Sequence, residues 1–172
     1  MRTSPLVVNT ARAGLVLREL VEQDAGALHA LLQASKAHLT RLGNFTAIAA
    51  ADLAAVAAEL AAQQPAPLSF AVVEGDAMVG RVDLVAVDPP RYGLGYWLAP
   101  WATGRGLATL AVLALLEYAR DDLHASDVYA GVTHNNHASA AVLHRTGFDR
   151  VADMGSYSRY HRRLAPEGAT MS

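Results

Sequence analysis

The sequence has no cysteine among its 172 residues, which excludes disulfides, thiolate metal sites and a cysteine nucleophile and suits a reducing compartment. Its net charge is only −2 at pH 7, so the composition does not point to a nucleic acid or an anionic membrane as the main partner. No apolar run approaches the roughly 20 residues of a membrane span, and the first residues do not resemble a signal peptide. These absences predict a soluble cytoplasmic protein.

The composition that remains is globular, with 52% hydrophobic and 17% charged residues. The length predicts a single domain over residues 1–172, with an ordered core at about 13–164 and a frayed tail at 165–172. The chain has 13 arginines, one lysine and 35 alanines, which we attribute to the codon usage of a GC-rich genome.

The pattern of apolar residues predicts an α/β (α+β) protein. Alternation and β-rich runs predict seven strands, at 15–20, 68–74, 78–87, 93–98, 127–132, 148–153 and 157–164. Amphipathic spacing and caps predict helices after Asp24, over 52–63, over 107–120 and over 136–146. An antiparallel meander followed by a strand–helix–strand unit indicates a mixed, mostly antiparallel sheet of about seven strands with helices on both faces.

The segment from Gly95 to Thr109 carries the clearest functional signal, because a strand ends in a glycine-rich turn and a long helix begins at once. Glycines let backbone N–H groups approach an anion closely, and a helix N-terminus adds unpaired donors and about half a positive charge. Such a turn suits a pyrophosphate. The Walker motif is absent, and the dinucleotide fingerprint lacks its third glycine, so a dinucleotide-binding enzyme is the weaker alternative.

Two motifs resemble those of the GCN5-related N-acetyltransferase (GNAT) superfamily. The run 103–108, Thr-Gly-Arg-Gly-Leu-Ala, resembles the acetyl-CoA signature Gln/Arg-x-x-Gly-x-Gly/Ala, and the Gly-Tyr-Trp-Leu-x-Pro phrase before it is similar to the RimJ/RimL branch. The run from Asn135 to Phe148 resembles the Asn-x-x-Ser-x-x-Val…Gly-Phe element, one strand later. Thr103 stands where Gln or Arg is usual, and we expect it to weaken the pyrophosphate contact.

The resemblance implies acetyl-CoA as co-substrate, no metal, and a sheet that splays open after the strand ending near Leu98. The pantetheine arm of the cofactor is expected to pair with the backbone exposed there. The implied cofactor-binding residues are Trp97, Leu98 and Ala99 on the strand, Thr103, Gly104, Arg105, Gly106, Leu107, Ala108 and Thr109 at the pyrophosphate, and Asn136 across the splay.

The implied reaction is direct attack of a neutral amine on the acetyl thioester. The family's usual tyrosine acid is replaced by Leu143, so Ser139 is the candidate donor to the departing thiolate; alternatively it is a small residue that allows close packing. Asp83 is the candidate base, or else a solvated or Arg81-paired carboxylate. A glutamate common in relatives is replaced by Gly93.

This scarcity of bases favours an acceptor amine of low pKa. An α-amine has a pKa near 8 and a lysine amine near 10.4, so far more of the α-amine is neutral at pH 7. We expect the acceptor to be a protein N-terminus or a small-molecule amine. The alternative is a non-catalytic acyl-CoA-binding sensor or interaction module, suggested by the changes at Thr103, Gly93 and Leu143.

Two further features concern partners. Trp101 is a candidate to cover the mouth of the cofactor site or to lie at a subunit contact, and a homodimer is expected because many relatives pair. His134 and His137 have a metal-ligand spacing, but no third ligand is evident, so no metal site is predicted.

Overall fold

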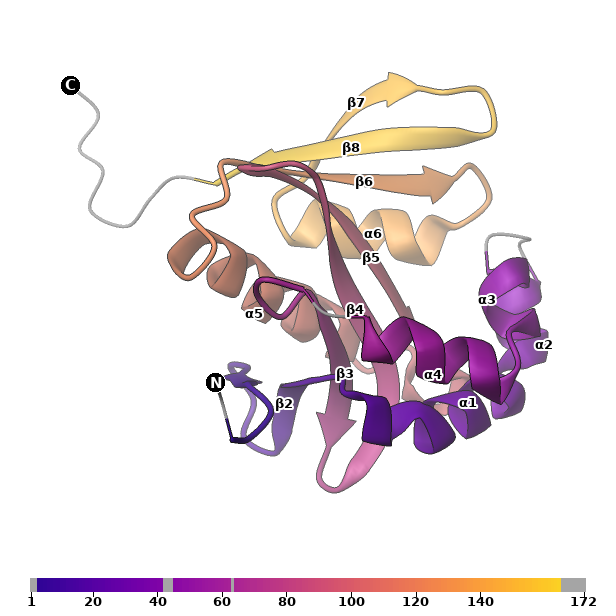
Figure 1. Ribbon diagram of the computed structural model, residues 1–172. Coiled ribbons are helices and arrows are strands. Elements are labelled where there is room, and N and C mark those ends of the chain that lie inside the picture. Colours follow the sequence, from indigo (N-terminus) through magenta and orange to yellow (C-terminus); the bar gives the residue numbers. More distant parts are fainter. Residues whose placement is uncertain (1–2, 42–44, 63, 165–172) are drawn as a thin grey trace.

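The protein folds around one eight-stranded sheet in the order β1-β2-β3-β4-β5-β6-β8-β7 (Figure 1). The computed structural model describes residues 3–41, 45–62 and 64–164, so the predicted tail at 165–172 lies outside the described residues. Every neighbouring pair of strands is antiparallel except β5 and β6, which are parallel. The predicted mixed, mostly antiparallel sheet is confirmed.

The strands are β1 (Val7–Asn9), β2 (Leu15–Glu19), β3 (Ser69–Glu74), β4 (Ala77–Asp88), β5 (Arg91–Leu98), β6 (Asp127–Thr133), β7 (Asp149–Asp153) and β8 (Tyr157–Arg163). The α-helices are α1 (Ala25–Ala34), α2 (Lys36–Thr40), α3 (Thr46–Ala50), α4 (Leu53–Ala61), α5 (Leu107–Asp121) and α6 (His137–Arg145). Short 3₁₀ turns, η1 (Glu22–Asp24) and η2 (Pro100–Ala102), precede α1 and α5.

Three short elements were not predicted. Strand β1 has three residues, and helices α2 and α3 have five each. Segments this short do not complete the pattern that distinguishes a helix from a strand. The sheet therefore has eight strands rather than seven.

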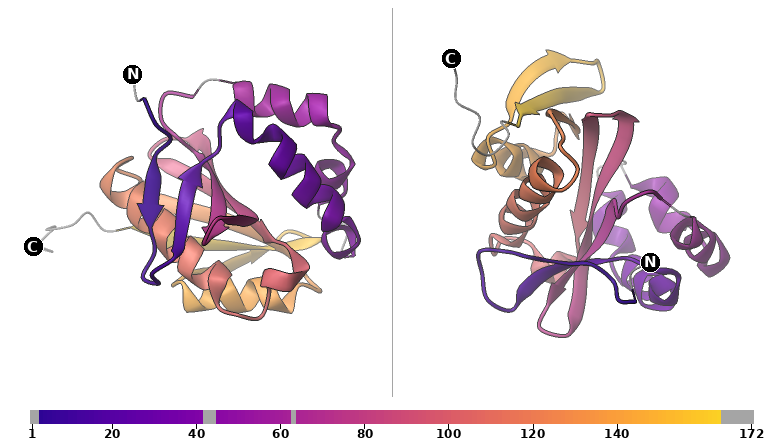
Figure 2. Two further views of the ribbon diagram at one scale, coloured as in Figure 1. Left: turned by 90° about the horizontal axis from the view of Figure 1, so that it is seen from below. Right: turned by 60° about the vertical axis from the view of Figure 1, so that its left-hand side comes forward.

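Helices cover both faces of the sheet, with α1–α4 on one side and α5 and α6 on the other (Figure 2). Strand alternation divides the core accordingly. Phe70, Leu94 and Leu98 are buried in the cluster that includes α5, whereas Ala71 and Trp97 are buried in the cluster that includes α1.

Local capping explains where several helices begin and end. The Asp52 carboxylate accepts from the Ala55 amide at the start of α4. Gly147, at φ +88°, ends α6 and directs the buried Phe148 into the core. Helix α1 begins after Asp24 as expected. The Asp24 carboxylate, however, accepts from Arg18 and from the Val21 amide and does not cap the helix.

The parallel pair β5–β6 is incomplete. Register pairs join only Arg91–Gly93 to Asp127–Tyr129, and the two strands then diverge. The remainder of β6 is held on its other side by β8, over all seven residues of both strands. The sheet is therefore open between the second half of β5 and β6.

Gly80 lies opposite Leu98 and sets how closely β4 approaches the open part of β5. A Cβ at this position would overlap the Trp97 carbonyl oxygen and lie 2.6 Å from Leu98 Cδ2. We expect Gly80→Ala to lower the free energy of unfolding by about 1–3 kcal/mol, as overpacking does. Urea denaturation followed by tryptophan fluorescence measures this change.

Gly26→Ala is the matched control, because an added Cβ in α1 meets nothing within 4 Å. Alanine is favoured over glycine in a helix, so this variant is expected to be neutral or up to about 1 kcal/mol more stable. A Gly80→Ala protein as stable as the Gly26→Ala protein would contradict the tight β4–β5 approach.

Candidate active site

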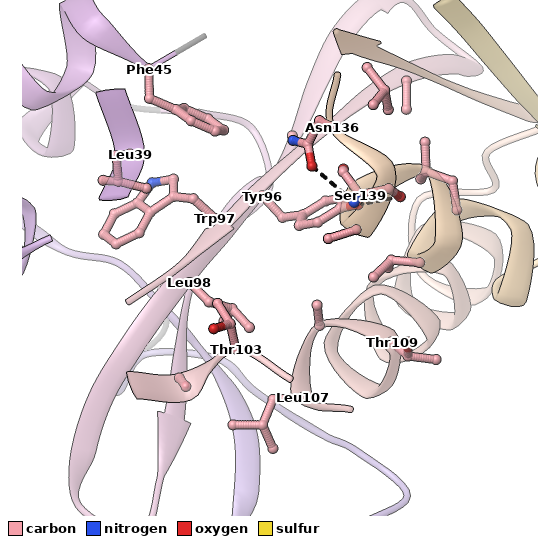
Figure 3. A pocket seen from close by; sticks show the side chains of 18 of the residues that line it. Leu39, Phe45, Tyr96, Trp97, Leu98, Thr103, Leu107, Thr109, Asn136 and Ser139 are labelled. Carbon is pink, nitrogen blue, oxygen red and sulfur yellow. Dashed lines mark hydrogen bonds between the residues drawn. The ribbon is translucent and has the colours of Figure 1, made fainter. Parts of the chain in front are cut away.

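A cavity of about 750 Å³ passes through the gap between β5 and β6. Its walls come from both faces of the sheet: Leu39 of α2 and Phe45 on one side, and the start of α5 and helix α6 on the other (Figure 3). Trp97 points toward Leu39, whereas Tyr96 points the opposite way, toward Ser139. The cavity thus joins two compartments separated by the sheet.

The backbone of β5 presents an open edge to this gap. The Ala99 amide donates to the Val79 carbonyl of β4, and its carbonyl accepts from Ala102. Because residues of an antiparallel strand alternate in the direction of their hydrogen bonds, Trp97 also faces β4, whereas Tyr96 and Leu98 face the gap. Of the three residues expected to offer backbone groups to a cofactor, only Leu98 has its backbone groups directed at the gap, together with those of Tyr96. The cofactor contacts of Trp97, Leu98 and Ala99 stay predictions.

The glycine-rich turn forms an anion cradle at one end of the cavity. Gly104 and Gly106 have φ of +72° and +78°, and the space where their Cβ atoms would lie is open. Helix α5 follows with no side-chain cap on its N-terminus. The first-turn amides of Leu107, Ala108 and Thr109 therefore have no acceptor within the helix, and all three residues line the cavity.

Two residues of the predicted pyrophosphate motif have side chains engaged within the protein. The Thr103 hydroxyl donates to the Pro100 carbonyl at 2.8 Å, although the residue lines the cavity. The Arg105 guanidinium pairs with Glu74, with Nη2 2.6 Å from Oε2, and Arg105 does not line the cavity. The donors directed at an anion here are backbone amides.

Helix α6 brings Ser139 to the opposite wall of the gap. The Asn136 side chain caps this helix by accepting from the Ser139 amide at 3.1 Å. The Ser139 hydroxyl lies 2.6 Å from the Tyr96 hydroxyl, which also lies 3.1 Å from the Ser139 carbonyl oxygen. This contact crosses the open part of the sheet (Figure 3).

Tyr96 is a candidate functional residue that the sequence reasoning missed. Burial raises the pKa of its hydroxyl to about 12, although the hydrogen bond with Ser139 acts in the opposite direction. The phenol is therefore a hydrogen-bond donor at neutral pH. Strand alternation was the available signal, since it places Tyr96 on the same face as Leu94 and Leu98. Leu143, at the family's tyrosine position, is fully buried and lines the same cavity.

Asp83 lies outside the lining of this cavity, in an ion-pair cluster on the α1–α4 face. Arg81 Nε lies 2.9 Å from Asp83 Oδ1, and the same guanidinium binds Glu59 of α4 and the Ser69 hydroxyl. Burial raises the pKa of Asp83 above its ordinary value, while Arg81 opposes that shift. Asp83 is therefore paired with Arg81, which is one of the two arrangements expected for this carboxylate. The role of Asp83 as a base stays a prediction.

The remaining predictions concern a metal site, a membrane span and the exposure of Trp101. Within the described ranges, no three His, Cys, Asp or Glu side chains gather closely enough to hold a metal ion. None of the described helices has the length and apolar character needed to cross a membrane. Trp101 is exposed, as an interface residue would be in the monomer.

The sheet is splayed, with an anion cradle on one side of the gap and an open compartment on the other. This arrangement is typical of proteins that hold a pyrophosphate-linked cofactor in the gap and a second substrate beyond it. The chain belongs to the acetyltransferase (GNAT) domain family, whose model matches residues 14–149. It is an N-acetyltransferase that uses acetyl-CoA as co-substrate. The match confirms the superfamily indicated by the two motifs.

Solved structures of several acetyltransferases have the same fold. RimL, a ribosomal L7/L12 alpha-N-protein acetyltransferase solved with coenzyme A, is 18% identical, with a TM-score of 0.78 over 92% of this chain and 98% of that chain. RimJ of Mycobacterium smegmatis, solved with a CoA disulfide, is 20% identical, with a TM-score of 0.75 over 94% and 90%. The microcin C7 self-immunity acetyltransferase MccE, solved with acetyl-CoA and AMP, is 15% identical, with a TM-score of 0.71 over 89% and 94%. No curated protein matches the chain significantly.

The cradle provides a direct test of cofactor binding. A β-branched side chain strains a left-handed backbone and would occupy the open space above Gly106. We expect Gly106→Val to weaken acetyl-CoA binding at least tenfold in isothermal titration.

Gly14→Val controls for backbone strain, because Gly14 has φ +84°, open space around it and no place in the cavity lining. This variant is expected to bind acetyl-CoA as the wild type does. Equal binding by all three proteins would show that the cofactor lies elsewhere.

Proposed function

We propose that the protein acetylates the α-amine of a protein N-terminus or a small-molecule amine, working in the cytoplasm. The observation that carries the proposal is the cavity through the β5–β6 gap, with an anion cradle on one face and the compartment beside Leu39 and Phe45 on the other. Two neighbours described as ribosomal-protein N-acetyltransferases support the N-terminal acceptor, and the MccE neighbour supports small molecules. A homodimer stays a prediction.

The residues of the gap fit acetyl-CoA. First-turn amides of α5 suit a pyrophosphate, and the open edge at Tyr96 and Leu98 suits the amide groups of the pantetheine arm. The co-substrate supplies an acetyl thioester, which a neutral amine attacks directly. The protein's part is to align the two substrates, exclude water and stabilise the charge that develops on the departing sulfur.

Tyr96 and Ser139 form the donor pair for that sulfur in this proposal. Tyr96 has one proton and keeps it at neutral pH, since burial raises its pKa to about 12. When the phenol donates to the Ser139 hydroxyl oxygen, and not to the Ser139 carbonyl, the serine proton is free to point toward the thiolate. The 2.6 Å contact therefore prepares Ser139 as a hydrogen-bond donor, without requiring serine itself to be acidic.

The non-catalytic alternative predicts acetyl-CoA binding with no thioester cleavage. A panel of peptides and small amines, assayed by thiol release and by mass spectrometry of the product, distinguishes the two functions. Transfer to at least one amine supports the enzyme. Binding without transfer over the whole panel would favour the sensor or interaction module.

The donor pair is tested by Tyr96→Phe and Ser139→Ala. Both variants are expected to lower kcat about tenfold to a hundredfold, because Ser139→Ala removes the hydrogen bond directed at the leaving group and Tyr96→Phe removes the contact that orients the serine proton. The acetyl-CoA Kd is expected to change less than about threefold, since neither side chain contributes an amide to the cradle. Stopped-flow thiol release and isothermal titration measure the two quantities.

Tyr118→Phe is the matched control, because it removes a buried phenol that donates to the Pro67 carbonyl outside the cavity. It is expected to lower stability and leave kcat unchanged. An unchanged kcat in the Ser139→Ala protein would assign Ser139 to close packing instead.

The pH dependence tests whether a dedicated base exists. No carboxylate lines the cavity in the described part of the chain, so we expect kcat/KM to rise with pH and level off near the acceptor amine's own pKa, about 8 for an α-amine. No descending limb is expected below about pH 10, because Tyr96 keeps its proton. Asp83→Asn should preserve this profile; a rising limb that disappears in that variant would identify Asp83 as the base.

A further inference from the structure

A second hollow, of about 470 Å³, adjoins the cavity on the face of the sheet that α1–α4 occupy elsewhere. It shares four lining residues with the main cavity, among them Gly95 and Gly131. We refer to this hollow, lined by Val85, Gly93, Leu94, Gly95, Tyr129, Ala130, Gly131, Tyr157 and Arg159, as the acceptor groove. It provides a route from solvent to the gap on the side away from the anion cradle.

Three glycines leave part of the acceptor-groove floor without side chains, although the Tyr157 ring lies over Gly131. Gly93 and Gly95 occupy successive positions on one face of β5, and Gly131 occupies the same face of β6. The register that pairs Gly93 with Tyr129 brings Gly131 level with Gly95. A Cβ at Gly95 would meet nothing within 4 Å, so the channel above β5 is open there.

The wall on β8 carries a guanidinium held by an aromatic ring. Arg159 Cζ lies 4.4 Å from the centroid of the Tyr129 ring, an arrangement of the cation–π kind. Tyr129 also contacts His161, whose ring centroid is 4.8 Å away and whose Nε2 lies 2.7 Å from Asp127 Oδ1. Asp127 also binds the Ser126 hydroxyl, so its carboxylate is already engaged.

Apart from tyrosines, the ionisable side chains around both hollows are all basic. His38, Arg41 and Arg145 line the cavity and Arg159 lines the groove, whereas no described carboxylate lines either. Arg145 belongs to α6 on the cofactor side, where anionic phosphates account for a positive charge. The other three lie on the opposite face, and no described carboxylate is within ion-pair distance of Arg159.

We propose that the acceptor carries a carboxylate close to its amine and that Arg159 binds this carboxylate in the acceptor groove. The inference rests on the proposed transferase function and specifies its substrate class. A guanidinium fork matches a carboxylate with two parallel hydrogen bonds, and its stacking on Tyr129 pre-orients it. An acidic side chain near a peptide N-terminus and the α-carboxylate of a free amino acid both supply the required group.

Two matched acceptor pairs distinguish these sources: peptides beginning Ser-Asp and Ser-Asn, and free amino acids compared with their amides. Thiol release with acetyl-CoA gives kcat/KM for each member. We expect the carboxylate member of at least one pair to be preferred tenfold or more, and the preferred pair identifies the source. Arg159→Gln is expected to abolish that ratio while changing kcat/KM for the uncharged member less than about threefold.

Arg163→Gln removes the same charge from the same face of β8, outside both hollows, and is expected to keep the wild-type ratio. Arg159→Lys is expected to restore part of it, because the charge returns without the fork. Equal rates within both pairs in the wild type, or a ratio unchanged by Arg159→Gln in a folded protein, would overturn the carboxylate inference and leave the transferase intact. Acetyl-CoA binding with no release from any acceptor would instead overturn the proposed transfer, and with it this inference.

Discussion

The divergence of β5 from β6 after Gly93 is the constraint on which the site depends. Backbone N–H and C=O groups in a protein interior need partners, and a strand edge with none is costly unless solvent or a ligand supplies them. Here the edge at Tyr96 and Leu98 borders a cavity, whose lining across the gap includes residues of both β6 and α6. The gap is therefore a binding surface made of main chain, which only a partner with its own amide groups satisfies well.

The ion-pair cluster at Arg81 explains the charge of the space around the gap. Arg81 is buried and binds two carboxylates, Asp83 and Glu59, together with the Ser69 hydroxyl. Breaking such a buried set is costly, because a charge would remain without its partner. Asp83 and Glu59 are thus both paired with Arg81, and the charged side chains that line the hollows are basic. This distribution is suited to anionic groups on both substrates.

Sequence reasoning located most of the elements and the cradle, because both depend on local patterns. The helix from Leu107 follows directly from two glycines, and Gly147 ends α6 as its position suggested. What it missed depends on contacts between distant segments. Tyr96 and Ser139 are 43 residues apart and meet because the sheet opens between them. The acceptor groove likewise joins β4, β5, β6 and β8, whose order in the sheet no local pattern specifies.

Three departures from the family's usual residues first suggested a protein without catalysis, yet each has a counterpart in the structure. Thr103 does not present a charge, but its hydroxyl closes the turn that precedes Gly104, and the α5 amides are available as anion donors. Leu143 removes the phenol from α6, while β5 supplies one at Tyr96 that reaches Ser139.

Gly93 removes a carboxylate from β5 and in doing so clears the floor of the acceptor groove beneath Val85. A protein that only sensed acyl-CoA would need the cradle and the open edge of β5. It would have no need of a hydrogen-bonded hydroxyl pair across the gap or of a second route into the cavity from the opposite face. Both features lie where an acceptor has to meet the thioester, and this coincidence is the structural reason for preferring transfer over binding alone.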